Sequence, residues 1–188
     1  MEFDILFGGL GGQGLQLATQ VLAQAATLEG KNVLQYCDYT SEMRGGKIDC
    51  TVVVAPAGEE IGSPRRPHPR AAVAMSARAW QEYRETVSVG GVLILNTSIV
   101  HGAAGRTDVH VLEVPTLRLA EEIGEPRAIS MIALGALISR TGVVSLEMAV
   151  EALRLSLPPH RQTLIAANEK ALRRGAAFDT AAAASVPS

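Results

Sequence analysis

The chain has 188 residues, of which 47% are hydrophobic and 19% charged, and its formal net charge at pH 7 is -2. This balance is typical of a globular protein, and a chain of this length can bury about 70% of its unfolded surface in a single domain. A charge this close to zero argues against nucleic acid as a partner. No apolar run reaches the roughly 18 residues of a membrane span and no signal-peptide pattern is evident, so we expect a cytoplasmic protein.

Cys37 and Cys50 are the only cysteines in the chain. They are too few for a disulfide framework or for an iron–sulfur cluster, and they lack CxxC spacing. We therefore expect reduced thiols. The histidines stand apart from one another, without the spacing of metal ligands, so the sequence predicts no metal site.

The most informative segment is a glycine-rich stretch directly behind the first apolar run, FDILF. It reads GGLGGQG over residues 8–14, and Gly9, Gly11 and Gly14 have the GxGxxG spacing. Glycine lets a backbone approach a phosphate closely, and the N–H groups that open the next helix face an anion. The sequence therefore predicts a Rossmann-like glycine turn after the first strand, with the Gln13 amide as a further donor.

Hydrophobic periodicity and β-branched runs predict the remaining elements. The expected strands are 3–7, 32–37, 48–55, 71–75, 92–95 and 109–114. The expected helices are 15–29, 77–85, 116–122, 128–139, 145–155 and 160–174. Thr116 and Ser145 are of the residue types that cap helices.

This alternation predicts an α/β fold with a mainly parallel central sheet, flanking helices and a helix-rich C-terminal part. We expect one domain over residues 1–178. Residues 179–188 are mostly Ala and Ser with few apolar anchors, which indicates a disordered tail.

A second glycine signature, Glu42-Met43-Arg44-Gly45-Gly46, lies between the second and third expected strands. A guanidinium beside two flexible positions suits a clamp for phosphate or carboxylate, or a docking loop on a partner. An ordinary surface turn with an incidental arginine is the alternative.

A proline-rich loop carries Arg65, Arg66, His68 and Arg70. This cluster could meet an anionic ligand, but a solvated loop is the interpretation we favour.

The order of these segments resembles the gamma subunit, or gamma domain, of the 2-oxoacid:acceptor (ferredoxin) oxidoreductases. The resemblance runs from about Phe3 to Gly175 and is greatest to the 2-oxoglutarate or branched-chain type. The matching residues are Tyr39, Glu42, Arg44-Gly45-Gly46, Cys50-Thr51-Val52-Val53, Ile61-Gly62-Ser63-Pro64, Gly90-Gly91, Asn96-Thr97-Ser98, and Ser130-Met131 through Ala136. Thr40 and Ser130 depart from the family pattern, which has glycine and asparagine at these two positions.

The resemblance implies a subunit of a complex that converts a 2-oxoacid, 2-oxoglutarate being the expected one, and coenzyme A into an acyl-CoA, carbon dioxide and a reduced acceptor. Thiamine diphosphate, Mg, iron–sulfur clusters and coenzyme A would lie on, or be shared with, other subunits. The implied partners are the alpha and beta subunits and, through the complex, ferredoxin or a similar acceptor. Alone, the chain would hold no cofactor stably, contribute no catalytic residue and be inactive, and its exposed partner face would favour self-association.

Contact with a cofactor is expected at the first two glycine signatures. These residues are Gly9, Gly11, Gly12, Gln13, Gly14, Arg44, Gly45 and Gly46.

Three alternatives stay open. The glycine turn and Asp38, as a ribose-binding acid, could belong to an autonomous NAD(P)-binding oxidoreductase. The chain could be a nonenzymatic scaffold. Within the resembled family it could also be the gamma subunit of an indolepyruvate- or pyruvate-type enzyme.

Overall fold

The computed structural model describes residues 2–39, 45–63, 67–100 and 105–184, and the side chains of Tyr39 and of residues 179–184 are not considered. The strands are β1 (Phe3–Leu10), β2 (Asn32–Tyr39), β3 (Lys47–Ala55), β4 (Ala71–Ala74), β5 (Val92–Asn96) and β6 (His110–Val114). The helices are α1 (Leu15–Leu28), α2 (Ala77–Thr86), α3 (Thr116–Glu122), α4 (Ile129–Thr141), α5 (Leu146–Ser156), the 3-10 helix η1 (Pro159–Leu164) and α6 (Ile165–Ala184).

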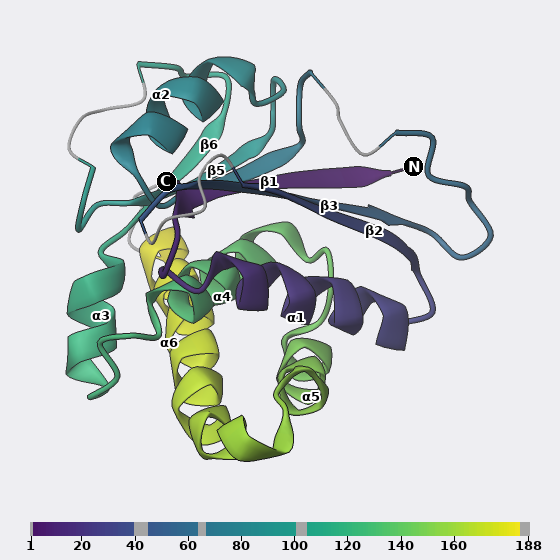
Figure 1. Cartoon of the computed structure of the whole chain (residues 1–188). Coiled ribbons are helices and arrows are strands. Elements are labelled where there is room, and N and C mark those ends of the chain that lie inside the picture. Colours follow the sequence, from purple (N-terminus) through teal and green to yellow (C-terminus); the bar gives the residue numbers. More distant parts are fainter. Residues whose placement is uncertain (1, 40–44, 64–66, 101–104, 185–188) are drawn as a thin grey trace.

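The strands form one six-stranded sheet in the order β2-β3-β1-β4-β5-β6. Strands β1, β4, β5 and β6 are parallel neighbours, whereas β3 runs antiparallel to both β1 and β2. Helix α2 covers one face, and α1 and α4–α6 lie against the other (Figure 1). The predicted α/β class and mainly parallel sheet are confirmed.

Most expected elements are present within a few residues of their predicted bounds. The hydroxyl of Ser145 caps α5 by accepting the Met148 N–H at 3.3 Å. Thr116 does not cap α3: it is the first residue of that helix, and its hydroxyl donates to the Asn96 side-chain oxygen at 2.7 Å. The last expected helix begins instead as η1, with Pro158 at its N-cap and Pro159 as its first residue.

Helix α6 continues to Ala184 and so includes the first part of the predicted tail. The final residues, 185–188, lie outside the described residues, and the disorder of the tail stays a prediction. None of the helices in the described parts of the chain is long and apolar enough to cross a membrane.

Two glycines let α4 and α6 cross in backbone contact. A β-carbon added at Gly135 would lie 2.9 Å from the Ala176 backbone nitrogen, and one added at Gly175 would lie 2.7 Å from the Ile132 carbonyl carbon. Real β-carbons do not approach backbone this closely. Gly135, in the segment Ser130 through Ala136 of the family pattern, therefore serves helix packing.

The expectation of reduced thiols is wrong: Cys37 and Cys50 form a disulfide. The two residues face each other in the antiparallel register of β2 and β3, with a Cα–Cα distance of 4.0 Å. The pairing depends on this register, which the spacing of the cysteines in the sequence does not reveal. The bond closes the hairpin that carries the second glycine signature.

Asp4 is a buried carboxyl group in the central strand β1, with 4% of its surface exposed. Its Oδ1 accepts the Arg70 backbone N–H at 3.2 Å, and its Oδ2 has no partner among the described residues. Burial raises the pKa of Asp4 above its ordinary value, and the hydrogen bond from Arg70 opposes this only in part. The protonated carboxyl is therefore more favoured in the folded state than in the unfolded chain.

We expect the disulfide to stabilise the fold by about 2–3 kcal/mol, the usual contribution for a loop of this length. Reductant should lower the free energy of unfolding of the wild-type chain, measured in urea, but should leave a Cys50→Ser variant unchanged. Thiol alkylation followed by intact-mass measurement checks the bond itself. Labelling of both cysteines before reduction would contradict it.

Asp4→Asn should raise Tm at pH 7.5 by about 2–4 °C, the shift that 1 kcal/mol produces in a domain of this size. Because the pKa of Asp4 is raised in the folded state, the stability of the wild type falls as pH rises from the pKa of Asp4 in the unfolded chain through its pKa in the folded state. The asparagine does not titrate. Calorimetry should therefore show the two melting temperatures converging as pH falls toward 4, and a constant difference would contradict the assignment.

Candidate functional site

The glycine turn and the second glycine signature meet at the carboxyl edge of the parallel strands. Residues 11–14 connect β1 to α1, and the Gly11 N–H donates to the Gly46 carbonyl at 2.8 Å. In open α/β sheets this edge is where ligands usually bind. Gly45 also lies in this contact, whereas Arg44 falls outside the described residues.

Four of the five glycines in residues 8–14, which are Gly9, Gly11, Gly12 and Gly14, have different physical roles. A β-carbon at Gly9 would lie 2.8 Å from a Leu15 methyl carbon, and one at Gly14 would lie 2.7 Å from the Ser130 hydroxyl. A β-carbon at Gly11 would lie 3.4 Å from the Gly45 backbone nitrogen. Only Gly12 of these four faces open space, and it has a positive φ of 96°. Gly12 is therefore the position of the turn where a ligand has room.

Gln13 braces the turn from within. Its Oε1 accepts the Leu10 N–H at 2.8 Å, and its Nε2 donates to the Met75 carbonyl at 3.0 Å. The side chain thus spans the carboxyl ends of β1 and β4, where the strand order reverses. One amide hydrogen remains for a ligand, and such a contact stays a prediction.

Two helix N-termini converge on this turn. Helix α1 begins behind Gly14 and α4 begins beside it, where Ser130 packs on the glycine. Neither helix has a side-chain cap or an acidic residue in its first turn. The positive ends of two helix dipoles suit an anion such as a phosphate.

Asn96, at the end of β5, is a polar residue of this edge whose role the sequence did not predict. Its side-chain oxygen accepts the Ser98 N–H at 3.0 Å and the Thr116 hydroxyl at 2.7 Å. Only 1% of the residue is exposed, and its Nδ2 has no partner among the described residues. The Asn-x-Ser pattern therefore reflects a turn that fixes the start of α3.

A charged network lies on the opposite face of β1, behind Gly8. The Asp49 carboxylate accepts hydrogen bonds from Tyr83 and Arg78, both at 2.8 Å, and pairs with Lys47 at 2.9 Å. Burial alone would raise the pKa of Asp49, but hydrogen bonds from these groups outweigh it and hold that pKa below its ordinary value. The network fixes β3, and with it the loop that reaches Gly11, to α2.

Asp38 does not lie where a ribose-binding acid would have to lie. Its strand, β2, is separated from β1 by β3, and Asp38 pairs with Asp49 in the sheet. The dinucleotide interpretation requires the acid to end the strand next to the glycine turn. The geometry does not support it.

The family model for pyruvate ferredoxin/flavodoxin oxidoreductase matches residues 4–178. The chain belongs to this family. It is 36% identical over 166 residues to the 2-oxoglutarate synthase subunit KorC of Methanothermobacter marburgensis, covering 85% of this chain and 88% of that protein.

Two further similarities bear on the assignment. The ketoisovalerate oxidoreductase subunit VorA of Methanothermobacter thermautotrophicus is 33% identical over 138 residues, which is 73% of this chain but only 28% of that protein. The crystal structure of a keto/oxoacid ferredoxin oxidoreductase gamma subunit from Geobacter sulfurreducens superposes with a TM-score of 0.79 at 28% identity, covering 95% of this chain and 99% of that one. Family membership was predicted from the motifs and is confirmed.

The described residues contain no group of three or more His, Cys, Asp or Glu side chains placed to hold a metal ion. The relatives named above are subunits of oxidoreductases. The carboxyl edge, where the two glycine signatures meet beside two helix N-termini, is the candidate site of this chain.

Gln13→Ala should destabilise the chain by about 1–2 kcal/mol, because it removes both hydrogen bonds by which the Gln13 side chain links the ends of β1 and β4. Gln20→Ala is the matched control, since Gln20 is an exposed glutamine on α1, and it should change stability by less than about 0.5 kcal/mol. Urea unfolding measures both. Equal effects would show that the Gln13 amide does not hold the turn.

Proposed function

We propose that this chain is the gamma subunit of a 2-oxoglutarate:ferredoxin oxidoreductase. The complex would convert 2-oxoglutarate and coenzyme A into an acyl-CoA and carbon dioxide while reducing its acceptor. The observation that carries the proposal is the match to KorC over 88% of that subunit's length. KorC is named as a subunit, so we expect this chain to work with partners rather than alone.

The carboxyl edge supports contact with coenzyme A. Gly12 gives a ligand close access to the turn, and the uncapped starts of α1 and α4 favour the phosphates of the coenzyme. Coenzyme A, when bound, supplies the thiol that takes the acyl group. In this proposal the chain binds and orients the nucleotide end of the coenzyme and performs no bond-breaking step itself.

The other cofactors belong to the partner subunits in this proposal. Thiamine diphosphate with Mg would form the adduct with the 2-oxoacid, and iron–sulfur clusters would carry the electrons to ferredoxin. Two cysteines cannot supply the four thiolates that such a cluster needs. We propose a cytoplasmic location for the complex.

Exposed apolar side chains near the site support a partner-facing edge. Leu10 is 43% exposed beside the glycine turn, and Ile99 and Leu117 are 47% and 42% exposed beyond the ends of β5 and β6. Exposed apolar surface of this kind is typical of interaction sites. We propose that the alpha and beta subunits cover it, and that the isolated chain self-associates through it.

A tag on this chain should recover the complex from its native cytoplasm. The eluate should reduce ferredoxin or a dye with 2-oxoglutarate and coenzyme A, and more slowly with pyruvate or 2-oxoisovalerate. Faster turnover of either competitor would reassign the substrate, while turnover by the isolated chain would overturn the subunit assignment. Binding of NAD(H) by the isolated chain would favour the dinucleotide alternative.

Gly12→Glu should raise the KM for coenzyme A at least about tenfold, because a carboxylate would occupy the open position and repel phosphate. The KM for 2-oxoglutarate should be unchanged. Gly58→Glu is the matched control: this glycine also has a positive φ, 80°, and faces open space. A coenzyme A KM that is equal in both variants would exclude the turn as its contact.

A further inference from the structure

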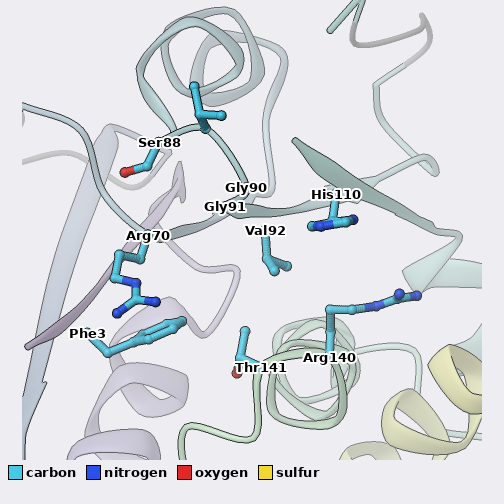
Figure 2. A pocket seen from close by; sticks show the side chains of 10 residues that line it. Phe3, Arg70, Ser88, Gly90, Gly91, Val92, His110, Arg140 and Thr141 are labelled. Atoms are coloured by element: carbon cyan, nitrogen blue, oxygen red, sulfur yellow. The ribbon is translucent and has the colours of Figure 1, made fainter. Parts of the chain in front are cut away.

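A pocket of about 390 Å³ lies at the amino edge of the sheet, opposite the glycine turn (Figure 2). It is lined by the starts of β1, β5 and β6, the turn before β5 and the C-terminal end of α4. Its volume is within the range of small-molecule sites. We name it the amino-edge pocket; its lining residues are Phe3, Arg70, Ser88, Val89, Gly90, Gly91, Val92, His110, Arg140 and Thr141.

The rim of the amino-edge pocket is held by backbone bonds around the Gly90-Gly91 pair. The Gly90 N–H donates to the Asp108 carbonyl at 2.7 Å, and the Gly91 carbonyl accepts the His110 N–H at 2.8 Å. A β-carbon at Gly91 would lie 2.8 Å from the carbonyl oxygens of Arg70 and Ser88. This glycine pair of the family pattern therefore builds a fixed wall, on which Arg70 and His110 are anchored.

The charge of the lining is one-sided. Two arginines and a histidine contribute to it and none of the ten lining residues is acidic, while the buried Asp4 carboxyl lies next to Arg70 and interacts with its charge. Figure 2 shows Arg70 and His110 on opposite sides of Val92, with Phe3 and Thr141 beneath them, while the Arg140 side chain extends away from Arg70. The Arg70 guanidinium lies 5.0 Å from the centre of the Phe3 ring, which holds it at this side of the pocket.

This arrangement fits a molecule with an anionic group at each end and an apolar middle. A guanidinium binds carboxylate in a forked geometry, and an imidazole N–H donates to an anion in either of its protonation states. Val92 and the Phe3 ring offer apolar surface between the two donors.

We propose that the amino-edge pocket binds a small organic dicarboxylate, with one carboxylate at Arg70 and the other at His110. The site is separate from the coenzyme A contact proposed for the glycine turn, because the two lie at opposite ends of the parallel strands. The proposal stands whether or not the chain acts on 2-oxoglutarate.

The test is isothermal titration of the full-length chain with succinate at constant ionic strength, with propionate and inorganic phosphate as competitors. Succinate should bind at least about tenfold more tightly than propionate, since only it reaches both donors. Arg70→Gln and His110→Gln should each weaken succinate binding at least about fivefold. Arg118→Gln is the control, because Arg118 is 63% exposed on α3 at the other edge of the sheet, and it should have no effect.

Three outcomes would overturn the proposal. The first is that succinate gives no heat up to about 10 mM. The second is that succinate and propionate bind with equal affinity. The third is that the wild type and both pocket variants bind succinate equally, while circular dichroism shows that all three are folded. Phosphate binding as tight as that of succinate would overturn the dicarboxylate assignment and leave a general anion contact. Succinate heat lost in both variants but kept in Arg118→Gln would establish the site.

Discussion

The antiparallel strand β3, inserted between β1 and β2, is the constraint on which this structure depends. Its ladder with β1 brings Gly46 to Gly11, so that two glycine signatures far apart in the sequence share one loop contact. Its ladder with β2 aligns Cys37 with Cys50. The same insertion separates β2 from the glycine turn, which removes the acid that a dinucleotide site would need. The position of this one strand thus brings the two glycine signatures together and places Asp38 away from the glycine turn.

Local patterns in the sequence predicted the local structure well, for physical reasons. The spacing of apolar residues reports which face of a helix is buried, and α1, α2 and α5 begin and end close to the expected residues. The order of strands is different, because it depends on contacts between distant segments. Residues 48–55 read as a strand, but nothing in them indicates that this strand runs antiparallel or lies between the first two. The disulfide and the position of Asp38 follow from that order and could not be predicted.

The candidate site shows the same division at the level of single residues. Residues 11–14 of the glycine-rich segment connect β1 to α1, and a β-carbon at Gly9 or Gly14 would clash with Leu15 or Ser130. Gln13, expected as a ligand donor, has intrachain partners on both of its polar atoms. A motif records where side chains must be absent; it does not record whether a neighbour or a ligand fills the space.

Helix α4 connects the two edges of the sheet. Its first turn packs on Gly14 through Ser130, and its last residues line the amino-edge pocket, so its 13 residues span about 20 Å between the two sites. At Gly135 the backbones of α4 and α6 are in contact, which restricts rotation of α4 about its own axis. The separation between the glycine turn and the amino-edge pocket is therefore set by the packing of α4.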